Sequence, residues 1–402
     1  MVKQKKVKKS TIKIPGFRDN PIDYTLLITV LLLLALGLIM VLSASSPTAL
    51  SEGRSSYAYF IRQGLFAILG IVAMIFISKI DYRIYKKFYI LAYIASLVLL
   101  AAVLVVGKRI NGAKRWIYIT SSLSFQPSEF VKLFMIIFYA TILTKNRDDL
   151  KYFFKGWIKN LIWLAPVIGL LIVEPHLSAS IVIIGICMVM MVLAGCKLWQ
   201  IIVPTTVIGI PGFLIAIYKI PKFAHALERI TTFVNPWQDK LGKGWQVIQS
   251  LYAIGSGGLF GLGLGQSKQK YLYLPEPQND FIFSVIAEEL GFVGCIFVIV
   301  LFGILIWRGI LVAMKSPDMF GSLIAVGITS LIGIQAIINI AVVTSSMPAT
   351  GMPLPFFSYG GTSLFILLCE IGILLNISRA GNKWYLKLKY IKNKNRREIL
   401  WG

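Results

Sequence analysis

The sequence predicts an all-helical integral membrane protein with about ten transmembrane helices. Its mean hydropathy is +0.76, and 57% of its 402 residues are hydrophobic. A spanning helix needs about 20 apolar residues in succession, and soluble domains do not carry many runs of that length. The basic residues between the apolar runs gather mainly on one side, as the positive-inside rule requires.

The number of apolar segments and the basic tails fix the topology. An even number of spans places both termini on one side. Seven Lys or Arg residues precede the first span and eight follow from Arg379 onward, so that side is the cytoplasm. The membrane domain covers 20–380, between basic tails at 1–19 and 381–402. The expected spans are about 23–43, 60–78, 86–106, 128–144, 159–174, 177–195, 199–218, 281–306, 319–343 and 356–378.

One short outer loop breaks the charge rule. The segment "GKRINGAKRW" (107–116) carries Lys108, Arg109, Lys114 and Arg115 and no acid. Either the charges around neighbouring helices determine the topology despite this loop, or the loop binds an anion on the outer side. Both interpretations stay open from the residues alone.

A long extracellular loop, 219–280, separates helices 7 and 8. Loops of this length are usually functional or disordered, and this one is rich in Trp, Tyr and Gly, which favours half-buried or re-entrant segments. Six glycines lie between 255 and 265, followed by Lys268 and Lys270. The glycines serve either close helix packing or the approach of backbone N–H groups to an oxyanion.

The net charge of +24 does not indicate a nucleic-acid partner. The basic residues cluster next to the membrane spans, where such clusters set topology and contact anionic lipid headgroups. The two histidines, His176 and His225, are too far apart in the sequence to suggest a metal cluster.

Acidic residues gather at the mouth of one expected helix. Only 17 Asp and Glu residues occur in the chain, and four of them fall within 275–294. Asp280 stands where the outer loop becomes a helix, so it either caps that helix or accepts a proton in a cavity. Glu288 and Glu289 lie about 12 Å further along. Carboxylates at that depth line a cavity or pair with cations such as Lys132. The four acidic residues of the segment 275–294 are Glu276, Asp280, Glu288 and Glu289.

A second polar motif, "QPSEFVK" (126–132), opens the fourth expected helix. Pro127 and Ser128 mark the helix start, after Gln126. Glu129 and Lys132 are three residues apart and share a helix face, which favours an ion pair. Lys132 is the more suitable of the two to face a ligand. The Pro- and Gly-rich segment 344–363 predicts irregular backbone, which membrane proteins tolerate where it lines a cavity.

These features converge on one outward-facing site with carboxylates, cations and irregular loops. A phospholipid, a polyprenyl diphosphate or a lipid-linked sugar would suit it.

Four blocks, "RINGAKRW", "FQPSEFVKL", "QSLYAIGSGGLFGLGLGQSKQKYLYLPEPQNDFIFSVIAEELGFVG" and "MPATGMPLPFFSYGGTS", resemble the SEDS family of FtsW, RodA and SpoVE proteins, in family order. Features such as "VLSASS" (41–46) and "NPWQDKLGKGWQ" (235–246) resemble the FtsW branch most, with elongation and sporulation paralogues as alternatives.

The resemblance implies an inverting peptidoglycan glycosyltransferase of the cytoplasmic membrane that polymerises lipid II at the outer face for septal wall synthesis. It implies undecaprenyl-diphosphate-linked glycan as donor, a class B penicillin-binding protein and other division proteins as partners, and Asp280 as the catalytic base. Mg²⁺ or Mn²⁺ could assist, although the sequence shows no metal site. The candidates for binding diphosphate or sugar are Arg109, Arg115, Lys132, Lys268, Lys270 and Glu276. Those expected to support the cavity are Gln126, Ser128, Glu129, Glu288 and Glu289.

Two rival functions remain open from the sequence. A lipid II flippase without catalysis would use intramembrane carboxylates such as Glu174 and Glu370 as its path. A scaffold for the transpeptidase would tolerate the loss of Asp280. The chain also departs from the family pattern at "EPHLSAS" (174–180), where His176 stands in place of the usual Asp.

Overall fold

The computed structural model describes residues 21–110, 113–118, 124–209, 224–240, 242, 244–271 and 273–401. Within these ranges, the side chains of 109, 110, 113, 201, 208, 224–228 and 383–401 lie outside the described part. The predicted basic tail 1–19 therefore falls outside the described residues, and the C-terminal tail is described only as a helix.

The predicted fold class is confirmed. Among the described residues, nine helices are long and apolar enough to cross a membrane, and a tenth, shorter apolar helix spans 198–207. The predicted span 199–218 is described only as far as 209, as α7 (Leu198–Pro204) and one π-helical turn (Thr205–Gly209). The nine helices are α1 (Tyr24–Ser51), α2 (Ala58–Ile77), α3 (Tyr89–Val106), α4 (Pro127–Lys145), α5 (Lys159–Val173), α6 (Leu177–Ala194), α11 (Ile282–Lys315), α12 (Met319–Val343) and α13 (Gly361–Trp401).

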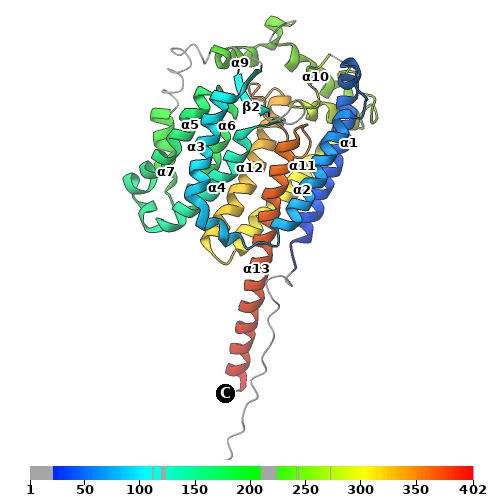
Figure 1. The fold of residues 1–402 in the computed structure, drawn as a ribbon. Coiled ribbons are helices and arrows are strands. Elements are labelled where there is room, and N and C mark those ends of the chain that lie inside the picture. The colour runs from blue at the N-terminus through cyan, green and yellow to red at the C-terminus, as the bar shows by residue number, and fades with distance from the viewer. Residues whose placement is uncertain are drawn as a thin grey trace, which may run out of the picture.

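The bundle has an interior and a lipid-facing rim. Helices α4 and α12 bury most of their residues, whereas α2 and α3 expose most of theirs. A helix that is apolar all round and exposed on one side suits a bilayer, because lipid tails replace the protein contacts. In Figure 1 the end of α13 projects from the lower end of the bundle, and α9, α10 and β2 lie over the upper end. That upper end is the outer side in the predicted topology.

The short basic outer loop forms a small sheet, which the sequence did not predict. Strands β1 (Lys108–Ile110), β2 (Ala113–Tyr118) and β3 (Ser124–Phe125) pair antiparallel in the order β1-β2-β3. The sheet directs two basic side chains of this loop, Lys114 and Arg115, to different partners. Lys114 Nζ donates to the Leu104 carbonyl at the end of α3, 2.9 Å away, whereas Arg115 donates to the carbonyl of Pro175.

The long outer loop contains ordered elements. Helix α9 (Ala224–Val234), a 3₁₀ turn (Pro236–Asp239) and α10 (Trp245–Gly257) precede a compact loop over 258–281. The side chain of Trp245 donates to the Tyr273 carbonyl at 2.6 Å and ties α10 to the end of this loop.

Helix α11 is broken at Gly291, where φ is +68° and ψ is −168°. The glycine-rich loop satisfies the backbone groups that the break releases. Leu262 N and Gly263 N donate to the carbonyls of Glu288 and Glu289 at 2.9 and 3.0 Å, and Phe292 N donates to Gly258 O at 3.0 Å. A Cβ on Gly261 would lie 2.2 Å from the Glu289 carbonyl oxygen. Of the two roles left open for the glycines, the structure therefore favours close packing.

Candidate active site at the outer end of the bundle

A cavity of about 250 Å³ opens between β2, the N-terminal ends of α4 and α13, and the turn before α11. It holds six of the predicted site residues at its mouth and wall, and a buried acid, Glu370, at its deeper end. The predicted residues that line it are Arg115, Gln126, Glu129, Lys132, Glu276 and Asp280.

Asp280 does not cap helix α11. The residue at the N-cap position is Phe281, and no side chain makes a capping hydrogen bond there. The Asp280 carboxylate is half-buried in the cavity wall, and a Cβ on Gly351 would lie 3.2 Å from its Oδ2 atom. Of the two roles open for Asp280, the geometry favours a carboxylate that serves the cavity.

The charge state of Asp280 is set by its surroundings. Burial raises its pKa from 3.8 to about 6, and the nearby Glu276 carboxylate adds to the rise. Arg229 and Arg115 oppose the shift. A carboxylate with a pKa near 6 is ionised at neutral pH and is a better proton acceptor than an ordinary Asp.

The loop 344–360 is pinned to the turn that carries Asp280. Ser358 Oγ donates to the Asn279 carbonyl at 2.7 Å, and Tyr359 N donates to Gln278 O at 2.8 Å. On the turn itself, Asn279 Nδ2 donates to Glu276 Oε2 at 2.7 Å. Irregular backbone thus lines the cavity as predicted, and Glu276 shapes the turn beside Asp280.

The predicted ion pair of the "QPSEFVK" motif is present. Lys132 Nζ contacts both carboxylate oxygens of Glu129, at 2.8 and 2.9 Å, and Ser363 Oγ on α13 donates to Glu129 Oε2 at 3.0 Å. Both charged side chains are buried and line the cavity. Ser128 is buried and does not line the cavity.

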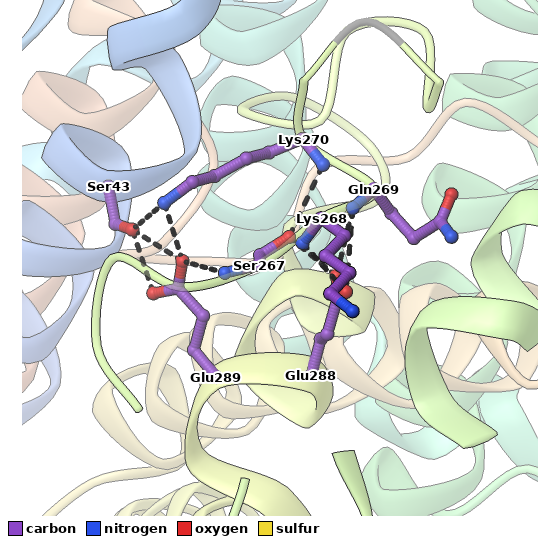
Figure 2. Close-up of polar contacts among 7 residues, drawn as sticks. All are labelled: Ser43, Ser267, Lys268, Gln269, Lys270, Glu288 and Glu289. Atoms are coloured by element: carbon purple, nitrogen blue, oxygen red, sulfur yellow. Dashed lines mark hydrogen bonds and ion pairs between the residues drawn. The ribbon is translucent and has the colours of Figure 1, made fainter. Parts of the chain in front are cut away.

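Four other predicted site residues are not in the cavity lining, and Figure 2 shows their contacts. Lys270 is buried and contacts Glu289 at 2.8 Å and Ser43 Oγ on α1 at 2.9 Å. The partner of Glu289 is therefore Lys270, and Lys132 is not involved. Neither Lys268 nor Lys270 lines the cavity, so this cavity gives no support to their assignment to a diphosphate.

Glu288 also has a structural environment. Its carboxylate accepts from the Lys268 backbone N–H at 2.8 Å and from the Ser267 hydroxyl at 2.5 Å, as Figure 2 shows. Several donors therefore satisfy this buried carboxylate. Glu288 and Glu289 thus fasten the glycine-rich loop to the broken turn of α11, outside the cavity.

The site includes residues that the sequence did not indicate. Arg229, within α9, donates to the Ala349 carbonyl at 3.0 Å and is close enough to lower the pKa of Asp280. Asn339 of α12 holds the backbone of Asp280. No motif marks either residue, because each reaches the site through tertiary packing. The side chain of Arg109 lies outside the described residues.

A divalent cation would need several carboxylate or imidazole ligands close together. No group of three or more His, Cys, Asp or Glu side chains in the described ranges is arranged to hold a metal ion. Glu276 and Asp280 are the two carboxylates at the cavity mouth that could contribute to one. We therefore assign no step to a cation.

Comparison with known proteins identifies the family. A model of the FtsW, RodA and SpoVE cell cycle proteins matches residues 24–383. The chain belongs to this family. It is 45% identical to stage V sporulation protein E of Bacillus subtilis, over 89% of this chain and 97% of that protein. It is 41% identical to a probable peptidoglycan glycosyltransferase FtsW of Trichlorobacter lovleyi, over 91% of this chain and 95% of that protein.

Solved structures of the family share the fold. A chain of a peptidoglycan synthase complex, described for its coordination of polymerization and crosslinking, aligns with a TM-score of 0.75 at 30% identity, over 90% of this chain and 98% of that chain. The rod shape determining protein RodA of Thermus thermophilus aligns with a TM-score of 0.65 at 29% identity, over 89% of this chain and 97% of that chain. The expected enzyme class of this SEDS protein, a peptidoglycan glycosyltransferase, is confirmed by its FtsW relatives.

Proposed function

We propose that this SEDS protein polymerises glycan strands from lipid II at the outer face of the bacterial cytoplasmic membrane, with Asp280 as the general base. The observation that carries the assignment is the position of its carboxylate. It does not cap α11, it lines the cavity, and Arg115 and Lys132 line the same cavity.

The chemistry follows from these groups. The 4-hydroxyl of the acceptor sugar gives its proton to Asp280 as its oxygen attacks the anomeric carbon of the donor. The bond from that carbon to the diphosphate oxygen breaks, and the diphosphate leaves with the electron pair. The anomeric carbon inverts, as in inverting glycosidases, which also use a carboxylate base. Arg115 and Lys132 supply positive charge for the leaving diphosphate.

The membrane fold suits a donor with a polyprenyl tail. The cavity lies among helix ends at the outer end of the bundle, so a headgroup can enter it while its tail stays in lipid. A transferase of this kind needs no domain for a nucleotide sugar.

The partner and the cellular role are parts of the same proposal. Because the chain resembles a component of a complex that couples polymerization to crosslinking, we expect a class B penicillin-binding protein to be its partner. We place it first in septal wall synthesis, with other division proteins, on the resemblance to FtsW. The identity of 45% to a sporulation protein favours spore wall synthesis as the second candidate.

One reconstitution separates polymerase, flippase and scaffold. The purified protein with its cognate penicillin-binding protein should convert lipid II into glycan strands on a gel. A flippase would move labelled lipid II across liposomes and form no strands, and a scaffold would do neither. Imaging a tagged copy in growing and sporulating cells would then distinguish the septum from the forespore membrane.

A further inference from the structure

One wall of the cavity contains buried polar atoms that have no hydrogen-bond partner in the described residues. It is built from Arg115 on β2, Gln126 before α4, and the turn 174–176 between α5 and α6. Arg115, Gln126 and His176 line the cavity, and Glu174 lies behind them, 1% exposed. Arg115 and Gln126 thus meet the distant turn 174–176 in the cavity that Asp280 also lines.

Arg115 donates a hydrogen bond to the Pro175 carbonyl, and the other contacts within this wall are long. Gln126 Nε2 lies 3.4 Å from His176 Nε2, and His176 Nδ1 lies 3.8 Å from Glu174 Oε1. The buried atoms without partners are Arg115 Nε, His176 Nδ1 and both carboxylate oxygens of Glu174. An unpaired buried polar atom is costly, and several in one place indicate a built binding surface.

Burial decides the charges of the wall. It lowers the pKa of His176 well below its usual range, with help from Arg115 and Lys132, so the ring is neutral. It raises the pKa of Glu174 to about 8, against the opposing effect of Arg115, so this carboxyl holds a proton at pH 7. The wall therefore offers neutral donors and acceptors beside one guanidinium group.

We propose that this wall is the subsite for the N-acetamido group of a substrate sugar. The amide carbonyl accepts a hydrogen bond from Gln126, and the amide N–H donates to a ring nitrogen of His176. Glu174 is a positioning residue that holds the His176 ring. The inference rests on the proposed function, because both sugars of lipid II carry a 2-acetamido group.

A phosphate fits this wall less well. Phosphate oxygens only accept hydrogen bonds, and the acceptor nitrogen of a neutral imidazole would face an anion. An amide offers one donor and one acceptor in a fixed plane, which matches the mixed character of His176 and Gln126. Lys132, which has no acceptor, remains the better partner for the diphosphate.

The test compares variants on matched substrates. The kcat/KM for polymerisation is measured with native lipid II and with two analogues that carry a free amine in place of one acetamido group, on either sugar. With native lipid II, His176→Ala and Gln126→Ala should each lower kcat/KM about tenfold, the value of one lost hydrogen bond. With one of the two analogues, the kcat/KM of wild type should also fall about tenfold from its value with native lipid II. The kcat/KM of each variant should be no lower with that analogue than with native lipid II.

Three comparisons keep the proposal falsifiable. Gln266→Ala removes an exposed amide outside the cavity and should behave as wild type with every substrate. Glu174→Gln, which mimics the protonated acid, should retain activity, and Glu174→Ala should lose it. If an analogue is not polymerised, its Kd for the purified wild type and variants is measured and compared in place of kcat/KM. Equal losses of His176→Ala on all three substrates would overturn the subsite, whereas no polymer from wild type would overturn the proposed function instead.

Discussion

The side-chain amide of Asn339 bridges the backbone carbonyls of Asp280 and Met352, each at 2.7 Å. It lies on α12, near the outer end of that helix, and is 1% exposed. One buried amide thus holds the turn that carries the proposed base and the irregular loop that covers it. Helix α12 sets the position of Asp280 even though it supplies no charged group there.

Replacing Asn339 should therefore impair catalysis through position. Asn339→Leu keeps the volume and leaves two carbonyls without this donor, which costs about 1–3 kcal/mol of stability for each that stays buried. A shift of about 1 Å in a catalytic group can cost on the order of 100-fold in rate. We expect a large fall in kcat with little change in KM, measured on folded protein. An unchanged kcat would show that Asp280 is held by other contacts.

The rate should depend on the protonation of Asp280. Because its pKa is about 6, the carboxylate that accepts the proton is present above pH 6 and is lost as the pH falls through that value. Below pH 6 the rate should drop about tenfold per unit. The effect on stability has the opposite sign, because a raised pKa favours folding below the ordinary value of 3.8 and this contribution is lost as the pH rises through about 6. A pH–rate profile flat from pH 5 to 8 would contradict the assignment.

Lys270 and Glu289 should matter for folding and not for chemistry. Removing one member of a buried ion pair leaves an unpaired charge and costs about 3–5 kcal/mol. Lys270→Met should therefore lower the melting temperature markedly, and Lys270→Met combined with Glu289→Leu should recover part of the loss. The kcat of the protein that remains folded should stay near wild type. A fall in kcat at full folding would return Lys270 to the diphosphate site.

Gly351 should tolerate no side chain. Its φ is +70°, a conformation that costs other residues about 1–2 kcal/mol, and a Cβ would press on Asp280 Oδ2. We expect Gly351→Ala to lower both stability and polymerisation. Gly53→Ala has a similar φ of +70° and open space around it, so it controls for backbone strain alone. Equal effects of the two variants would show that the contact with Asp280 is unimportant.

Local patterns predicted the spans and one ion pair well. Runs of apolar residues define helices irrespective of their neighbours, and the spacing of Glu129 and Lys132 forces them onto one helix face. The break of α11 was not predictable, because Gly291 becomes non-helical only where the loop 258–263 supplies replacement hydrogen bonds. The small sheet at 108–125 was missed because its strands are two to six residues long.

The site was predictable only in part. Asp280, Glu276 and Arg115 reach the cavity from the segments that the sequence singled out. Lys268 and Lys270 carry the same charge in the same outer region, and only tertiary packing turns Lys270 toward Glu289. Arg229 and Asn339 carry no local signal, because they reach the site by donating to the backbone carbonyls of Ala349 and Asp280, more than 50 residues away.

The most direct test compares Asp280→Asn with Glu276→Gln and wild type in polymerisation of purified lipid II, each with the cognate penicillin-binding protein. Both substitutions keep the shape and remove one charge at the cavity mouth. A general base contributes about 10²–10⁴-fold, so Asp280→Asn should form almost no glycan while staying folded and partner-bound, and Glu276→Gln should retain most activity. Glycan formation by folded Asp280→Asn at a rate near wild type would contradict the assignment of Asp280 as the base.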